Sequence, residues 1–225
     1  MSKINRFFTN SLGLNGHLEQ NLSIQGQIYM DPINLIEQVS KCVICEPHLP
    51  LGARPVIQFN ANARILIAGQ APGIKVHETG KPFNDASGNR LREWLGLSVD
   101  EFYDPQKIAI LPMGFCYPGK GKSGDLPPRK ECAPAWRAQL LAALPNLELT
   151  IVLGKYAQAY HLPHTKNRPL TELVKSWREY WPEHLVLPHP SPRNNIWLKK
   201  NPWFAQDVLP ELAERVAAIL NEEPQ

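Results

Sequence analysis

The sequence predicts an α/β fold, a three-layer α/β/α sandwich around a central, mainly parallel sheet of four strands. Short apolar runs alternate with segments of helical periodicity, which is the pattern of parallel strands joined by crossover helices. The 22 prolines fall mostly between these runs and indicate rigid connections. With 225 residues, 43% hydrophobic and 20% charged, the chain has the composition of an ordinary globular domain.

The expected elements follow from those runs. Buried strands are predicted at 63–69, 107–113, 147–154 and 184–192, the last of which runs into a loop. Helices are predicted at 31–42, 87–97, 133–144, 155–162, 170–181 and 201–220, with a break near Pro210. Asp31 suits an N-cap and Pro32 the first helical position, so this helix should bury Leu35, Ile36, Val39 and Val43. Ser87 is expected to cap the next helix.

A single domain is expected over residues 1–225, with a polar, loosely held arm at 1–30. The absence of a secretory or membrane-length apolar segment predicts a cytoplasmic protein with no membrane partner. A monomer is the default expectation, since the sequence carries no sign of an oligomeric state. The net charge of +3 and the pI of 8.6 permit a nucleic-acid partner without requiring one. Dedicated charge-driven binders usually have a pI above about 9.

Two predicted strands end in unusual loops. "GQAPG" (69–73) follows the first strand and "HPSPRNN" (189–195) follows the fourth. Because the carboxyl ends of parallel strands share one edge of a sheet, both loops should meet over one ligand site. Glycines permit close backbone approach, and prolines stiffen the segment around His189. Each loop alone is equally consistent with a structural turn.

The segment "TGKPFNDASG" (79–88) contains an aromatic residue in a polar loop. Phe83 could stack on a flat ligand, and its alternative role is a core anchor. Asp85 stands before a predicted helix, where a carboxylate is equally well explained as an N-cap.

The four cysteines are expected to be thiols or metal ligands, because cytosolic proteins rarely contain disulfides. Cys42 and Cys45 form a CxxC pair, and Cys116 and Cys132 flank a proline-rich loop. Zinc and an iron–sulfur cluster both suit four thiolates. Unrelated buried cysteines are the structural alternative.

Together these stretches resemble the uracil-DNA glycosylase superfamily from about Cys42 to Phe204. "GQAPG" looks like its first active-site motif, and "HPSPRN" is similar to the second motif of the single-strand-selective branch. The cysteines resemble those that hold a [4Fe–4S] cluster in the bacterial families four and five. The resemblance implies cleavage of the N-glycosidic bond of a flipped base in DNA.

The resemblance also implies roles for individual residues. His189 would stabilise the negative charge on the departing base, and Asp85 would activate the water and stabilise the cationic sugar. The implied base-binding residues are Gly69, Gln70, Ala71, Phe83 and Asn84. The implied DNA-binding residues are Ser191, Pro192, Arg193 and Asn194, with Lys199 and Lys200 as further phosphate contacts. Cys42, Cys45, Cys116 and Cys132 would hold the cluster, with zinc or no metal as alternatives.

The chain departs from the family in two places. Its first motif has Gln70 and Ala71, where family four usually has Glu at the second position and the classical branch has Asp at the third. Family five also has Ala at the third position and an Asp before "xSG" in the next loop, which Asp85 in "NDASG" matches. The resemblance therefore implies Asp85 as the base, with His77 and Glu78 as weaker candidates. Pro112 and Met113 stand where the family often has an asparagine that reads uracil. Uracil is the leading substrate, in single-stranded or duplex DNA, but this departure leaves hypoxanthine, xanthine or another deaminated or oxidised base as alternatives.

Two other functions stay open at this point. A catalytically silent member would bind DNA or a damaged base without releasing it. An unrelated α/β enzyme would use "GQAPG" as a phosphate-binding turn for a small nucleotide.

Overall fold

The computed structural model describes residues 31–122 and 124–222, so the arm expected at 1–30 lies outside the described residues. The chain divides into a unit of residues 1–31 and a unit of residues 32–225, and every element below belongs to the second. In the described part of the chain, no helix is long and apolar enough to cross a membrane.

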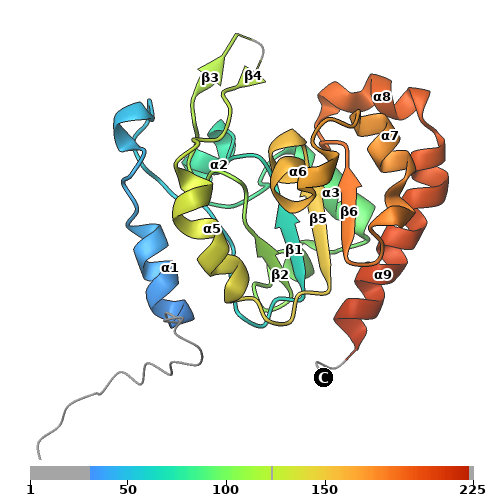
Figure 1. The fold of residues 1–225 in the computed structure, drawn as a ribbon, viewed down its shortest axis with the longest axis horizontal. Coiled ribbons are helices and arrows are strands. Elements are labelled where there is room, and N and C mark those ends of the chain that lie inside the picture. The colour runs from blue at the N-terminus through green and yellow to red at the C-terminus, as the bar shows by residue number, and fades with distance from the viewer. Residues whose placement is uncertain (1–30, 123, 223–225) are drawn as a thin grey trace, which may run out of the picture. The chain divides into compact units, whose positions relative to one another are not determined.

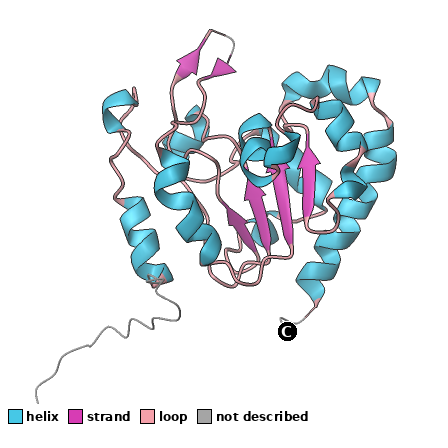
Figure 2. Ribbon diagram, viewed as in Figure 1, coloured by secondary structure: helices cyan, strands magenta, loops and turns pink. Residues whose placement is uncertain are grey.

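Four parallel strands form the central sheet, which confirms the predicted α/β architecture (Figures 1 and 2). The strands are β1 (Ile65–Ala68), β2 (Ile108–Ile110), β5 (Leu149–Leu153) and β6 (His184–Leu187). Their order is β2-β1-β5-β6, and Ile67 of β1 pairs with Ile110 on one side and Ile151 on the other. Almost every strand residue is buried, because helices cover both faces of a parallel sheet.

Helices pack on both faces of this sheet. Figure 1 shows α5 (Cys132–Ala142) and α6 (Lys155–His161) on the viewer's side and α3 (Ala86–Leu95) behind the strands. The long helix α9 (Leu209–Asn221) packs against α3, and α1 (Pro32–Ser40) packs against α5. The sandwich is completed by α7 (Leu170–Lys175) beside β6.

The strand order creates a switch point between β1 and β5. The chain leaves β1 toward β2 on one side and leaves β5 toward β6 on the other. Ligand sites of open α/β sheets lie beyond the carboxyl ends of the strands at such a point. A ligand site is therefore expected among the loops after β1, β2 and β6.

Several local predictions were wrong. Val43 lies beyond the end of α1 and is 58% exposed, so its spacing did not place it in the core. Asp85, and not Ser87, caps α3. The helix expected at 170–181 stops at Lys175 and continues as a short 3-10 turn, Trp177–Glu179. Before α9, a π-helical segment at Phe204–Val208 places Pro210 at the start of the helix, where its missing N–H is tolerated.

Four short elements had no counterpart in the prediction. They are α2 (Ile74–Thr79), α4 (Val99–Phe102), α8 (Asn195–Lys200) and a two-stranded hairpin of β3 (Lys120–Gly121) and β4 (Gly124–Asp125). Each is too short to carry a clear periodicity. The hairpin and α8 both rise beyond the carboxyl ends of the central strands (Figure 1).

Candidate active site

A cavity of about 640 Å³ opens at the carboxyl edge of the sheet. The loop after β1, the start of α3, the exit of β2 and the loop after β6 all contribute to its wall. The prediction that "GQAPG" and "HPSPRNN" meet over one site is therefore confirmed. Its volume suits a flat heterocycle and part of a sugar.

The two adjacent central strands hold the first loop in place. The segment after β2 continues the ladder beyond the regular strand: Met113 N–H donates to the Gly69 carbonyl (2.9 Å), and Gly114 N–H donates to the Gln70 carbonyl (3.0 Å). Gln70 and Ala71 line the cavity on this rigid frame. A short helix, α2, begins directly after the loop, with Gly73 as its N-cap.

Phe83 lines the cavity in an unusual backbone conformation. Its φ of 52° is the single positive value among the described non-glycine residues. Its ring lies edge-on to Phe102, with centroids 6.2 Å apart, and close to Gly69, where an added Cβ would stand 3.6 Å from the ring. Gly88 makes this arrangement possible, because a Cβ there would stand 1.7 Å from the Phe83 carbonyl oxygen. Phe83 is thus both anchored and exposed to the cavity.

Asp85 has both of the roles that its sequence position allowed. Its Oδ1 accepts the Gly88 N–H at 2.9 Å, which makes it the N-cap of α3. It also lines the cavity together with His189. One carboxylate oxygen is therefore used by the helix, and the other is not bonded within the described hydrogen-bond set.

His189 follows β6 and is half-buried. Ser191 N–H donates to its Nδ1 (3.2 Å), so a neutral ring carries its proton on Nε2. Burial lowers the pKa of His189, and the negative charge of Asp85 partly opposes that shift. The ring is therefore neutral near pH 7 and can donate a hydrogen bond from Nε2.

The loop that carries His189 is fixed from several directions. Asn194 donates through Nδ2 to the His189 carbonyl (2.7 Å), and Ser191 Oγ accepts the Arg193 N–H (3.3 Å). From α3, Arg90 Nη1 donates to the carbonyls of Pro190 (3.3 Å) and Ser191 (3.1 Å). Sequence reasoning missed Arg90, since a helical arginine carries no signal of its distant partner.

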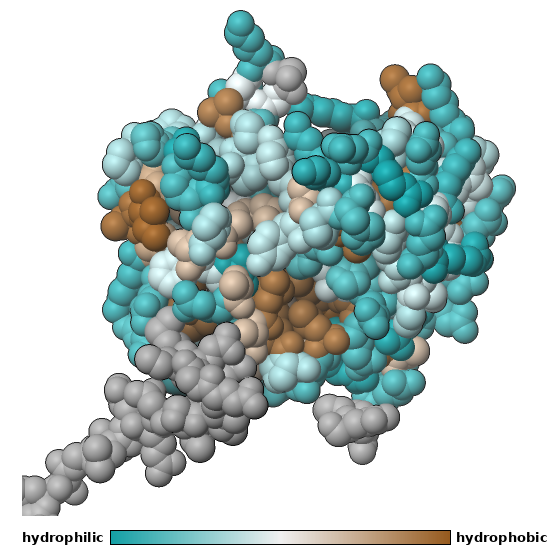
Figure 3. Space-filling view, in the orientation of Figure 1, coloured by the Kyte–Doolittle hydropathy of each residue, from teal (hydrophilic) through white to brown (hydrophobic). Residues whose placement is uncertain are grey.

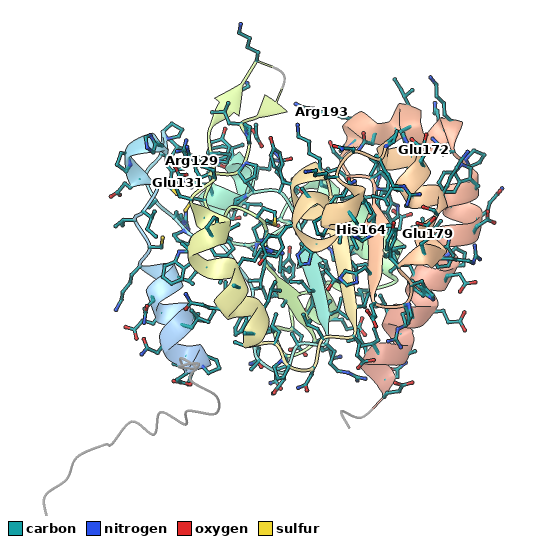
Figure 4. The ribbon with its side chains drawn as sticks, viewed as in Figure 1. Arg129, Glu131, His164, Glu172, Glu179 and Arg193 are labelled. Atoms are coloured by element: carbon teal, nitrogen blue, oxygen red, sulfur yellow. The ribbon has the colours of Figure 1, made fainter. Side chains whose placement is uncertain are left out.

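The rim of the cavity joins the hairpin and α8. Arg193 is exposed and its Nη1 lies beside Gly124 of β4, so closely that a Cβ there would stand 2.6 Å away. Figure 4 shows Arg193 at the upper edge between these two elements. Ile196 on α8 is 69% exposed, and the mainly hydrophilic face in Figure 3 has only separate apolar patches. Further exposed cations on these elements are Lys120, Lys122, Lys199 and Lys200.

The remaining predicted residues lie outside this wall. Asn84 and Glu78, the latter on α2, are both exposed, and neither lines the cavity. The His77 ring packs near Tyr117, with centroids 6.1 Å apart, and its buried Nδ1 has no partner in the described structure. Asp125, which the sequence did not single out, lines the cavity close to Gly73. A carboxylate at the start of α2 disfavours a bound phosphate, which argues against the small-nucleotide alternative.

All four cysteines line a second, smaller cavity of about 20 Å³, which has room for about one water. Cys42 and Cys45 approach from the end of α1, Cys116 from the segment after β2, and Cys132 from the first turn of α5. Trp136 Nε1–H donates to Cys42 Sγ (3.2 Å), and Phe115 N–H donates to Cys132 Sγ (3.4 Å). Burial raises the pKa of Cys116 to about 11 and that of Cys132 to about 12.

Four thiols are the right ligand type for a metal centre, but the described side chains do not lie at ligating positions around one point. Among residues 31–122 and 124–222, no group of three or more metal-ligating side chains is placed to hold an ion. The shared cavity and the N–H groups directed at sulfur are nevertheless what a thiolate-bound centre requires. The residues therefore fit such a group by chemistry and by location.

One ion pair lies beside the cysteine cavity. Arg129, which lines this cavity, pairs with Glu131 at 2.7 Å, and the Cys45 Sγ lies 3.9 Å from Glu131 Oε2. Figure 4 labels Arg129 and Glu131 next to each other. Arg54 stands between two residues that line this cavity, Ala53 and Pro55, and its Nη1 donates to the carbonyls of His77 and Glu78 on α2.

This fold and this edge-of-sheet cavity define an α/β protein with one rigid aromatic wall, a neutral histidine donor and a neighbouring carboxylate. The chain belongs to the uracil DNA glycosylase superfamily, whose family model matches residues 56–213.

Curated relatives carry a more specific description. A type-4 uracil-DNA glycosylase of Saccharolobus solfataricus is 26% identical over 206 residues, which cover 87% of this chain and 89% of the relative. A type-4 uracil-DNA glycosylase of Thermotoga maritima is also 26% identical, over 133 residues that cover 58% of this chain and 65% of the relative. The solution structure of a Methanosarcina acetivorans protein, provisionally described as a uracil DNA glycosylase, overlaps with a TM-score of 0.39 at 20% identity and covers 69% of this chain and 94% of its own.

Proposed function

We propose that the protein is a monofunctional DNA glycosylase that hydrolyses the N-glycosidic bond of a flipped-out deaminated base, with uracil as the leading substrate. The observation that carries the proposal is the convergence of Phe83, Asp85 and His189 on one cavity at the sheet edge. Membership of the superfamily and the type-4 relatives support it.

The geometry suggests how each residue would act. The extruded base would lie against the Phe83 ring, and its carbonyl oxygen would accept the His189 Nε2–H. The C1′–N bond would break with its electron pair on the base, while a water would add its oxygen to C1′ and give its proton to the Asp85 carboxylate. A neutral histidine needs no proton transfer to stabilise this anion, so His189 acts as a donor already in place.

Asp85 would orient the water and balance the positive charge that develops on the sugar. The first motif offers no carboxylate, because Gln70 and Ala71 occupy that loop. The Gly88 N–H fixes Asp85 in place through one oxygen, and the other oxygen can accept from water. Anchoring of this kind reduces the reorganisation that the reaction requires.

The DNA would contact the rim. Arg193, Lys199 and Lys200 would meet phosphates, and the exposed Ile196 would enter the gap that the extruded base leaves in a duplex. Ser191, Pro192 and Asn194 would act mainly by holding this loop in its observed shape. Single-stranded DNA would need no such wedge.

The four cysteines would hold a [4Fe–4S] cluster, with zinc as the alternative. When bound, the cluster would supply a structural cross-link between the end of α1 and the start of α5 and no chemical step. An absorbance scan of anaerobically purified protein distinguishes the two metals. A broad visible band indicates thiolate-bound iron, and metal analysis without that band indicates zinc.

Base release from end-labelled oligonucleotides followed by alkaline cleavage tests the main proposal. Substrates carry uracil, hypoxanthine or xanthine, single-stranded and duplex. Asp85→Asn should lose about 10²-fold or more of the single-turnover rate. Asp104→Asn is the matched control, because Asp104 likewise accepts a nearby backbone N–H, from Gln106 at 2.9 Å, but does not line the cavity.

A second candidate function is favoured by one observation: the first motif lacks a carboxylate and Asp85 is partly used as a helix cap. In this case the protein binds a damaged base without releasing it. Tight, lesion-dependent binding in a mobility-shift assay with no cleavage at any base would favour this function over catalysis.

A further inference from the structure

Arg137 on α5 is a completely buried cation, at 0% exposure. Its Nη1 donates to the carbonyls of Leu111 (2.9 Å) and Pro112 (3.1 Å) at the exit of β2. Its Nη2 lies 2.6 Å from Nε2 of His161, and its guanidinium stacks over the Tyr160 ring at 5.2 Å. The side chain thus joins α5, α6 and the strand exit.

No carboxylate neutralises this charge within the described residues. Burial lowers the pKa of Arg137 to about 10, which still leaves the group charged at neutral pH. Burial and the nearby Arg137 lower the pKa of His161 to about 3, so His161 is neutral and its Nε2 can accept the bond. The Arg137 Nε is also buried without a partner in the described structure.

At the amino end of the sheet, the largely buried arginines are paired with a carboxylate. Arg64 there pairs with Glu148 at 2.5 Å, and Arg215 joins the same carboxylate at 3.1 Å. Buried charges are normally paired in this way, because leaving water is costly. At the carboxyl end no carboxylate meets Arg137 in this way within the described residues, and the nearby groups that favour its charge are Tyr160 and Cys132.

The peptide that Arg137 holds forms part of the active-site wall. Pro112 lines the cavity, and the N–H groups of Met113 and Gly114 bond the carbonyls of Gly69 and Gln70. A guanidinium that fixes the Leu111 and Pro112 carbonyls therefore fixes both adjacent strand exits. Its charge lies behind the wall, in a poorly solvated interior where Coulomb interactions are strong.

We propose that Arg137 is a positioning residue of this site, whose unpaired charge also favours the negative charge that develops on the departing base. The inference rests on the proposed glycosylase function. Arg137 would have two effects. Its hydrogen bonds to the Leu111 and Pro112 carbonyls would set the shape of the cavity wall, and its positive charge would stabilise the departing base through the protein interior.

Leaving-group dependence distinguishes this role from a purely structural one. Fluorine at position 5 makes uracil a better leaving group, so 5-fluorouracil needs less help from a positive charge. Single-turnover release is measured from matched single-stranded oligonucleotides with uracil or 5-fluorouracil. Arg137→Met fills the space without charge, Arg137→Gln keeps hydrogen-bond donors, and Arg137→Lys keeps the charge.

We expect both neutral variants to slow uracil release at least about tenfold more than 5-fluorouracil release. Arg137→Lys should restore the wild-type ratio of the two rates, even where both rates fall. The control Arg64→Gln should lower the thermal midpoint and leave the ratio unchanged. Folding is checked by near-ultraviolet circular dichroism, and the apolar Met variant is expected to fold even if Gln does not.

An unchanged ratio in the folded neutral variants of an active enzyme overturns the inference and leaves the proposed function standing. Failure of the wild type to release uracil and 5-fluorouracil overturns the inference, and failure on hypoxanthine and xanthine as well overturns the proposed function.

Discussion

The two cavities at the carboxyl edge of the sheet share a wall yet differ in nearly every property. The segment after β2 contributes Pro112 to the larger cavity and Gly114, Phe115 and Cys116 to the smaller one. The larger, about 640 Å³, is open and lined by two carboxylates, a histidine and the loop after β1. The smaller, about 20 Å³, is lined mainly by thiols and apolar groups. One segment thus supports two different kinds of site.

The two cavities therefore have different roles: the larger would act on the substrate, and the smaller holds distant parts of the fold together. Groups in the open cavity are held by hydrogen bonds that leave one functional atom free, as in His189 and Asp85. Groups in the cysteine cavity connect elements that are distant in sequence, from α1 to α5. Changes in the first cavity should therefore alter turnover at nearly constant stability, and changes in the second should do the reverse.

The largest expected effect on turnover is that of His189→Ala. Loss of a hydrogen-bond donor at a developing anion costs about 10²–10³-fold in rate, so single-turnover uracil release should fall by that amount. The thermal midpoint should change little, because the ring is only half-buried. His164→Ala, an exposed histidine outside the cavity, is the control and should retain full activity. A His189→Ala enzyme with normal rates would remove His189 from the mechanism.

Gly88→Ala tests whether the Phe83 conformation matters. The new methyl group would stand 1.7 Å from the Phe83 carbonyl oxygen, so the backbone must shift and carry the ring with it. A displacement of this size can cost about 10²-fold in rate. Overpacking should also lower the free energy of unfolding by about 1–3 kcal/mol, which a urea titration measures.

The matched control for that substitution is Glu93→Ala, at an exposed position of the same helix. It should leave both the rate and the urea midpoint within error. Normal base release by a folded Gly88→Ala protein would mean that the base does not need the Phe83 ring where the structure places it.

Cys132→Ser should reverse the pattern by lowering stability more than it lowers the rate per folded molecule. The thiol accepts the Phe115 N–H and would contribute one ligand of the proposed cluster. Its loss should remove bound metal and lower the unfolding free energy by at least about 2 kcal/mol. Metal analysis and thermal denaturation measure the two effects, and Val43→Ser, at an exposed position within the CxxC segment, is the control. Unchanged metal content and stability would contradict the structural role.

The sequence predicted the central parts of this comparison well. Uninterrupted apolar runs such as "ILIA" and "LTIVL" identify buried strands, and parallel topology alone brings the loops after β1 and β6 together. The spacing of the four cysteines correctly placed them around one cavity.

Other features depend on tertiary contacts that no local pattern records. Asp125 enters the cavity because a hairpin of two-residue strands folds over it, and its glycines and charges read as an ordinary loop. Arg137 resembles any helical arginine until the carbonyls that it binds are known. Val43 fitted the helical spacing, but α1 ends before it.

A smaller effect on DNA affinity is expected from Ile196→Ala. The side chain is 69% exposed on α8, and as a wedge it would contribute on the order of 1 kcal/mol to a flipped duplex. Duplex binding should weaken about fivefold, while single-stranded binding should stay the same. Ile33→Ala, on α1, is the control, because Ile33 is also strongly exposed, at 78%. Equal losses on both substrates would argue against a wedge.

The smallest expected effect is a lowered pKa of the His189 ring. Burial disfavours the protonated ring, so the folded protein holds this proton less tightly than the unfolded chain does. His189 therefore becomes protonated at a lower pH than an ordinary histidine, and base release should persist to a correspondingly lower pH. The same shift means that stability falls with decreasing pH in that range, because the unfolded state binds the additional proton.

Removing the charge of Asp85 tests the direction in which this carboxylate shifts the pKa of His189. Its negative charge raises the pKa of His189 against the larger effect of burial, so Asp85→Asn should lower the NMR titration midpoint of the His189 ring further. Asp104→Asn should leave that midpoint unchanged. A rise in Asp85→Asn would mean that the carboxylate does not act on His189 through charge. The two residues would then belong to separate parts of the cavity wall, and only His189 would remain linked to the departing base.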